Sequence, residues 1–196
     1  MTKPDENREV RSGTPAEVRA EGEDEIRVQG YAAVFDAPTE IGDYFVELIA
    51  PGAFTESLAR SDDVPFLINH RDLPLARTGS GTLRLVEDER GLRVETELDP
   101  SDPDVMRIVP KMKRGDLSKM SFAFRAVREE WDESGDMPRR TIHEAELFDV
   151  SIVTDPAYQA TEIGLRSLEA SRAVGSEKDA AAIAARMNRK ARLAGV

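Results

Sequence analysis

The sequence predicts a mainly β protein with a few flanking helices, an α+β fold. Most of its apolar residues occur in segments that alternate with polar residues at a period of two, which is typical of strands. Glycine- and proline-containing turns separate these segments, and apolar residues at helical spacing occur in only a few places. The length of 196 residues allows one domain with a substantial core, plus tails.

Two strands and a short helix are expected first. Residues 25–35 form a long alternating segment in which Gly30 suggests a bulge or a sharp bend. Residues 43–49 form the second strand. The next segment, 53–59, has Phe54 four residues before Leu58 and predicts a short helix with an apolar inner face.

The middle of the chain predicts a buried strand, a hairpin and a longer helix. Residues 64–69 are apolar except at the end, which favours burial on both faces, and His70 follows directly. Residues 81–98 contain two alternating segments around a polar turn that ends in glycine, which indicates a hairpin. A helix follows, because Asp102 can cap its start and Pro103 suits its first position.

A long hairpin is expected to end the ordered part. Residues 119–131 and 139–153 are two strands joined by a Ser-Gly-Asp turn at 134–136. In the first of them, alternation separates Ser121 from the neighbouring phenylalanines. Pairing would bring Ser121 close to Asp149 in the second strand.

The two ends of the chain differ from this domain in composition. Residues 1–24 are charged and almost free of large apolar side chains, so we expect a disordered arm. The domain is expected over residues 25–165. Residues 166–196 are polar, then alanine-rich and basic, and predict a flexible or helical tail.

Composition excludes several classes of function. The net charge of -11 argues against binding to phosphate backbones, so nucleic acid is not an expected partner. The absence of cysteine excludes disulfides, thiolate metal sites and cysteine nucleophiles. No apolar run approaches the roughly 20 residues of a membrane span, and the N-terminus lacks the apolar core of a signal peptide. We therefore expect a cytoplasmic protein that does not bind membranes.

Ser121 is the candidate that carries chemistry. A hydroxyl in such a strand is often only structural, but it becomes a nucleophile when a base accepts its proton. His70 and His143 are the two histidines available. Asp149 interrupts an apolar strand, is expected to share a face with Leu147, and should therefore have a charged or polar partner.

At this point the chain resembles the prohead maturation proteases of tailed bacteriophages of the HK97 type, which are related in fold to the herpesvirus assemblins. The resemblance covers roughly residues 25–165. It depends on five short motifs in this order: GYAAVFD at 30–36, ELIAPGAF at 47–54, INHR at 68–71, KMSFAFR at 119–125 and ELFDVSIVTDPAY at 146–158.

The resemblance implies a β-barrel core of the assemblin type and a catalytic triad. By match to the family motifs, Ser121 would be the nucleophile, His70 the general base, and Asp149 the third residue where the phage proteins more usually have glutamate. Glu146 is the reserve candidate for that third position. The family's oxyanion donors lie in the loop that here covers residues 154–159, which lacks the expected arginine, so they are not assigned.

Other uses of these residue types are less well supported. His143 and the adjacent Glu144 would point to opposite faces of a strand, so no metal site is expected, and nothing indicates a cofactor. Ser118 and Ser151 are rival hydroxyls, but Ser118 precedes the apolar run and Ser151 has no counterpart in the family motif.

The expected function is that of a serine endopeptidase. Its substrates would be the scaffold, or the scaffolding segment of the major capsid protein, and the protease itself, inside the prohead in the host bacterial cytoplasm. A homo-oligomer is compatible with the sequence. The alternative is a non-catalytic capsid assembly or scaffolding protein that keeps the protease fold.

Overall fold

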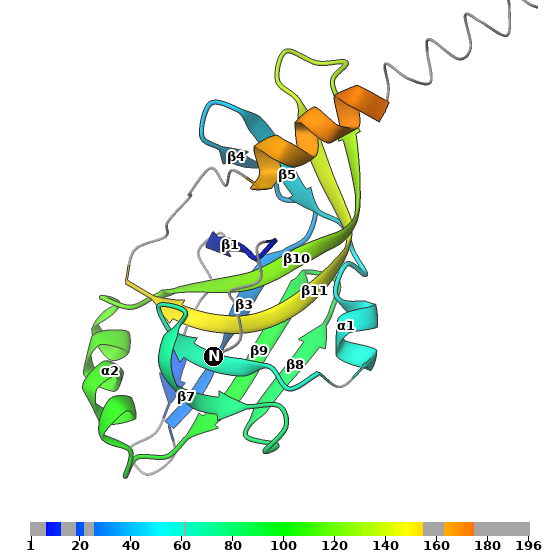
Figure 1. Cartoon of the computed structure of the whole chain (residues 1–196). Coiled ribbons are helices and arrows are strands. Elements are labelled where there is room, and N and C mark those ends of the chain that lie inside the picture. The colour runs from blue at the N-terminus through cyan, green and yellow to red at the C-terminus, as the bar shows by residue number, and fades with distance from the viewer. Residues whose placement is uncertain (1–6, 13–18, 22–25, 61, 155–162, 175–196) are drawn as a thin grey trace, which may run out of the picture. The chain divides into compact units, whose positions relative to one another are not determined.

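The structure is a computed structural model, and the residues that it describes are 7–12, 19–21, 26–60, 62–154 and 163–174. The chain divides into two compact units, residues 1–159 and 160–196. In the second unit, the described residues 163–174 form one helix. The first unit contains all of the strands described below (Figure 1).

Two sheets form the first unit. The seven strands of the larger sheet are β1 (Glu9–Ser12), β4 (Thr39–Ile41), β5 (Phe45–Ile49), β6 (Pro65–Ile68), β7 (Arg71–Arg77), β10 (Lys119–Asp132) and β11 (Arg139–Val153). They run in the order β1-β10-β11-β5-β4, and β6 connects β11 to β7. The four strands of the smaller sheet are β2 (Arg19–Glu21), β3 (Ile26–Val34), β8 (Leu83–Glu87) and β9 (Gly91–Leu98), in the order β2-β3-β9-β8.

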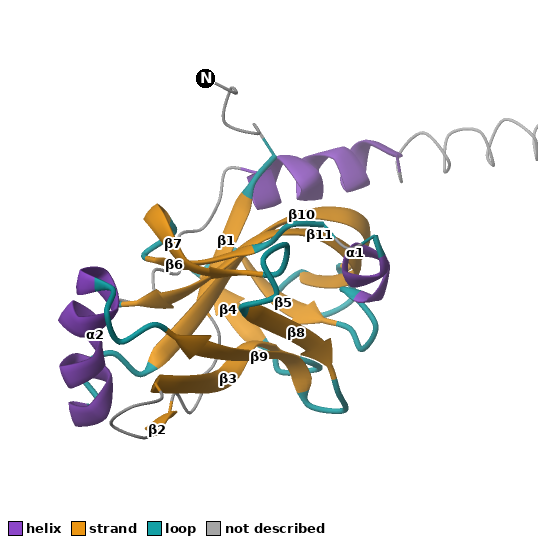
Figure 2. Ribbon diagram, turned by 90° about the horizontal axis from the view of Figure 1, so that it is seen from below, coloured by secondary structure: helices purple, strands orange, loops and turns teal. Residues whose placement is uncertain are grey.

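The expected fold class is confirmed at the level of its elements. The unit is mainly β, with the helices α1 (Thr55–Ala59) and α2 (Pro103–Arg114) beside the sheets (Figure 2). Asp102 caps α2 by accepting a hydrogen bond from the backbone N–H of Asp104, as its sequence predicts. The strand pairings described do not close either sheet, so the barrel-like core that the family resemblance implies is not confirmed.

The predicted hairpin of β10 and β11 is the longest feature of the fold (Figure 1). The two strands pair antiparallel from Lys119 and Val153 to the turn. On its other edge, β11 pairs in parallel with β5 near its start and with β6 near its end. Strand β11 therefore lies between β6, which leads into His70, and the part of β10 that carries Ser121.

A bulge in this hairpin changes which face Asp149 occupies. Ala123 pairs with Asp149, whereas the next residue, Phe124, pairs with Leu147, so Phe148 is the extra residue. The expectation that Asp149 shares a face with Leu147 was wrong for this reason. Leu147 belongs to the core, and Asp149 lies on the face of Ser121.

One hydrophobic core includes residues of both sheets. Phe122 is central to it, with its ring 5.5 Å from that of Phe54 and 5.0 Å from that of Phe124. Leu92 and Val94 contribute from the smaller sheet. Because Phe122 points into this core, the neighbouring Ser121 points to the opposite face of the larger sheet.

The expected disordered arm over residues 1–24 is corrected at two places. Strand β1 pairs antiparallel with β10, and β2 pairs antiparallel with β3. Composition suggested disorder because the segment has few apolar residues, but buried ion pairs with Glu47 and Arg140 fix β1 instead. Among the helices that the structure describes, none has the length and apolar character needed to cross a membrane.

Candidate active site

His70 lies in a two-residue turn between β6 and β7. Ile68 pairs with Arg71, and the two residues between them have positive φ angles, 52° for Asn69 and 60° for His70. Two such residues are typical of a type I′ hairpin turn, in which asparagine is favoured first and glycine usually follows. Residues other than glycine are uncommon at positive φ, although asparagine and histidine adopt it more often than most, and such backbone conformations concentrate at functional sites.

The imidazole of His70 contacts the hydroxyl of Ser121. Its Nε2 atom lies 2.6 Å from Ser121 Oγ. The side chain of His70 is 14% exposed, whereas Ser121 has no exposed surface. The turn therefore directs the ring onto the face of β10 opposite the core.

The other ring nitrogen of His70 contacts Asp149. Nδ1 lies 2.6 Å from Asp149 Oδ1, and the second carboxylate oxygen forms an ion pair with Arg8. The Asp149 side chain is 3% exposed. An ionised carboxylate only accepts hydrogen bonds, so it favours the tautomer with the proton on Nδ1 and leaves Nε2 free to accept a proton.

Ser121, His70 and Asp149 thus form one hydrogen-bonded chain from three strands or turns. The predicted site residues are brought together by the structure, although they are far apart in the sequence. Such an arrangement can remove the proton of a hydroxyl and stabilise the resulting imidazolium, which activates the oxygen as a nucleophile for acyl transfer.

Comparison with known proteins assigns the family. The family model described as "Caudovirus prohead serine protease" matches residues 14–173 of the chain. The chain belongs to this family.

A curated protein that is similar to the chain is the "Prohead protease" of Enterobacteria phage HK97. It is 32% identical to the chain over 106 residues, which is 53% of this chain and 44% of the relative. The chain thus aligns with less than half of the length of that relative. No solved structure matches the chain significantly.

Ser151 also belongs to this hydrogen-bonded site, although the sequence did not reveal it. Its hydroxyl accepts a hydrogen bond from the backbone N–H of His70 at 3.1 Å and donates one to Asp149 Oδ1, also at 3.1 Å. It is completely buried. The sequence indicates Ser151 only as a rival hydroxyl to Ser121. Its pairing opposite Ser121 in the β10–β11 register is the signal that would have placed it here.

The remaining candidates lie apart from this hydrogen-bonded chain. Glu146 forms an ion pair with Arg125, and His143 lies 3.3 Å from Glu130. Ser118 is exposed. In the part of the chain that the structure describes, no group of three or more histidine, aspartate or glutamate residues is arranged to bind a metal ion.

The loop expected to supply oxyanion donors lies mostly outside the described residues. Only Thr154 is described, and its backbone N–H donates to the side-chain oxygen of Asn69 at 3.0 Å. The donors are therefore still not assigned.

Two surface hollows differ in whether they adjoin the candidate site. The larger one, of about 750 Å³, lies on the smaller sheet and is lined by residues such as Arg27 and Glu97. A hollow of about 480 Å³ adjoins the His70 turn through Asn69 and Thr154, and Arg107 also lines it. Of these two hollows, the second is the one next to the candidate site.

Proposed function

We propose that the chain is a serine endopeptidase in which Ser121 is the nucleophile, His70 the general base and Asp149 the residue that orients the imidazole. The observation that carries the proposal is the hydrogen-bonded chain of Asp149, His70 and Ser121, with both distances at 2.6 Å. Membership of the prohead serine protease family supports it.

The geometry supports a two-step acyl transfer. Ser121 Oγ attacks the carbonyl carbon of the scissile bond while His70 Nε2 takes the hydroxyl proton. His70 then gives this proton to the leaving amine, which leaves an ester between Ser121 and the substrate. Water hydrolyses this ester with His70 again acting as the base. Asp149 keeps the ring in the required tautomer and stabilises its positive charge, since it already accepts from Nδ1.

The proposed substrates are the scaffold, or the scaffolding segment of the major capsid protein, and the protease itself during prohead maturation. The name of the HK97 relative, "Prohead protease", supports this assignment. We propose that the chain acts inside the prohead in the host cytoplasm. The proposed protease domain of residues 25–165, with an assemblin-type core, would then also include β1 as a docked strand.

Coexpression with the cognate capsid and scaffold proteins tests this function. Wild-type chain, Ser121→Ala and Ser118→Ala are compared, and the capsid products are identified by mass spectrometry. Ser118→Ala is the matched control, because Ser118 is an exposed hydroxyl near the same strand.

We expect the wild type and Ser118→Ala to truncate the capsid or scaffold protein, and Ser121→Ala to leave both intact. Equal truncation by Ser121→Ala would refute the proposed nucleophile. Normal prohead assembly with no truncation by any variant would instead favour the non-catalytic scaffolding role.

A further inference from the structure

The N-terminal strand β1 lies beside the nucleophile. It pairs antiparallel with β10, with Ser12 opposite Ser121 and Arg11 opposite Phe122. Ser121 Oγ donates a hydrogen bond to the backbone carbonyl of Arg11 at 2.8 Å. Ser121 is 0% exposed with this strand in place. A protease must bring a substrate carbonyl to its nucleophile, and here the chain supplies one of its own.

The position of this carbonyl is compatible with attack. A C=O bond is about 1.2 Å long, so the carbonyl carbon of Arg11 can lie no more than about 4 Å from Oγ. Reacting atoms in a near-attack arrangement are about 3 to 3.5 Å apart, a small further movement. The Ser121 hydroxyl has one proton and two acceptors, the Arg11 oxygen and His70 Nε2. Donation to His70 turns the oxygen into the attacking group.

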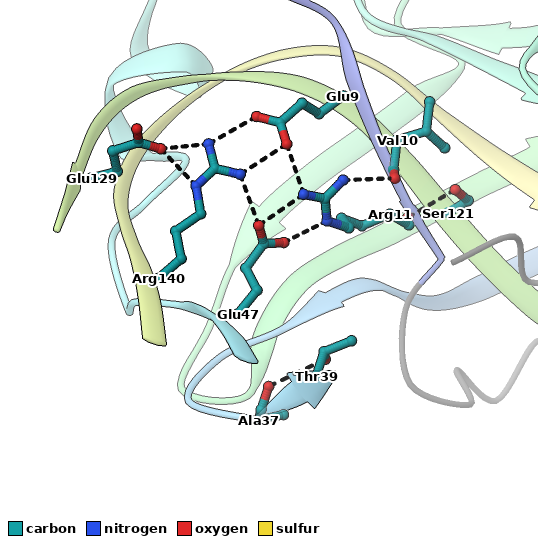
Figure 3. A network of polar contacts seen from close by, with 9 residues as sticks. All are labelled: Glu9, Val10, Arg11, Ala37, Thr39, Glu47, Ser121, Glu129 and Arg140. Carbon is teal, nitrogen blue, oxygen red and sulfur yellow. Dashed lines mark hydrogen bonds and ion pairs between the residues drawn. The ribbon is translucent and has the colours of Figure 1, made fainter. Parts of the chain in front are cut away.

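The side chain of Arg11 enters a buried acidic site. Its Nε and Nη2 atoms donate to the two carboxylate oxygens of Glu47 at 2.6 and 2.8 Å (Figure 3). The Arg11 side chain is only 5% exposed, and its guanidinium lies 5.6 Å from the centre of the Phe124 ring. A cavity of only about 30 Å³ remains beside it, so the site is nearly filled. Such bidentate geometry is selective for arginine.

Glu9 points to the same face two residues earlier, as strand alternation requires. It accepts two hydrogen bonds from Arg140, at 2.8 and 2.9 Å, and one from Arg11 at 2.7 Å (Figure 3). Burial alone would raise the pKa of Glu9, but the hydrogen bonds and positive charges of Arg140 and Arg11 outweigh it and lower that pKa. The strands around β1 thus provide a cation, Arg140, for Glu9 and a carboxylate, Glu47, for Arg11.

From these contacts, and resting on the proposed function, we propose that β1 is bound as a substrate strand and that the enzyme cleaves its own Arg11–Ser12 bond. Glu47 recognises a basic residue immediately before the bond, and Arg140 recognises an acidic residue two positions earlier. Other substrates with this charge pattern would bind to the same edge of β10 after β1 leaves it.

The chemical step balances within the residues already described. The Oγ–C bond to Arg11 forms as the C–N bond to Ser12 breaks, and the proton passes from Oγ through His70 to the Ser12 nitrogen. Water then hydrolyses the ester. The products are a carboxylate at Arg11, a new N-terminus at Ser12 and the regenerated hydroxyl of Ser121.

The test follows the mass of the full-length chain over time after purification. Wild type, Ser121→Ala, Arg11→Gln and Val10→Ala are compared. Val10 is the matched control because its side chain lies on the other face of β1, away from Glu47. Thermal unfolding of each variant checks that it is folded, and cleavage of the cognate capsid protein is measured in parallel.

The wild type is expected to lose residues 1–11 and begin at Ser12, while Ser121→Ala stays intact. Arg11→Gln should be cleaved about 10- to 100-fold more slowly, because charged hydrogen bonds are lost, and Val10→Ala within about threefold of the wild-type rate. If Arg11→Gln does not fold, synthetic peptides of residues 5–18 with arginine or glutamine at position 11 are given to the wild-type chain, and the same difference is expected.

Three results would overturn the inference. Cleavage of the capsid protein by a wild-type chain whose Arg11–Ser12 bond stays intact would make β1 a structural strand and leave the proposed function standing. Equal cleavage rates with arginine and with glutamine at position 11 would show that Glu47 does not select a basic residue there. Absence of cleavage in both the chain and the capsid protein would overturn the inference and the proposed function together.

Discussion

The Nδ1 atom of His70 lies 2.6 Å from Asp149 and not near Glu146, although both acids belong to the same strand. We therefore predict that Asp149→Asn lowers kcat by about 10³- to 10⁴-fold, because the amide no longer fixes the required imidazole tautomer. Glu146→Gln is the matched control and should retain nearly full activity. Rates of capsid-protein cleavage by purified variants give the measurement. The reverse order of effects would assign the orienting role to Glu146.

Ser151 is predicted to act as a positioning residue. Its hydroxyl accepts a hydrogen bond from the backbone N–H of His70 and donates one to the carboxylate of Asp149. Ser151→Ala should lower kcat by about tenfold and leave KM nearly unchanged, since alignment of the ring matters for the chemical step more than for binding. Steady-state kinetics on a peptide substrate measure both constants. A change confined to KM would contradict this role.

The turn that carries His70 should be sensitive to the residue before it. Asn69 has a φ of 52°, a conformation that is costly for residues with a Cβ and free for glycine. Both Asn69→Ala and Asn69→Gly lose the hydrogen bond from Thr154. We expect Asn69→Ala to be about 1 kcal/mol less stable than Asn69→Gly in urea unfolding. Equal stabilities would mean that the turn relaxes to another conformation.

Acid should weaken the attachment of β1 through Glu9. The pKa of Glu9 is lowered in the folded chain from its ordinary 4.5, so its ionised form favours the folded state. This contribution is fully present above about pH 4.5 and is lost as the pH falls through the lower folded-state pKa.

The measurement is the difference in unfolding free energy between Ser121→Ala and the double variant Glu9→Gln/Ser121→Ala, which both keep residues 1–11 attached. We expect a difference of about 3 to 5 kcal/mol at neutral pH, typical of breaking a buried ion pair, that shrinks below pH 4.5. A difference that does not change with pH would show that Glu9 is not the titrating group.

Much of the fold could be predicted because the signals are local. The β10–β11 hairpin follows from two alternating segments and a short turn, and α2 follows from Asp102 and Pro103 at its start. The contacts of His70, Ser121 and Asp149 were anticipated from short motifs that resemble a known family. Their roles stay predictions until the variants are measured.

Other features depend on partners that are distant in the sequence. Glu9 meets Arg140 across 131 positions, so composition alone indicated disorder where β1 forms. Strand β7 was not predicted, because Asp72 and Pro74 interrupt its pattern and its pairing with β6 decides it. The bulge at Phe148 was missed because alternation assumes an unbroken pairing.

The central claim is that His70 activates Ser121 for attack on a carbonyl. A fluorophosphonate probe reacts with such a hydroxyl, and peptide mapping by mass spectrometry locates the adduct. In a preparation that cleaves its capsid protein, we predict one adduct, on Ser121, which is lost in His70→Ala and kept in Ser118→Ala. An adduct on another residue, or equal labelling of Ser121 without His70, would contradict the account.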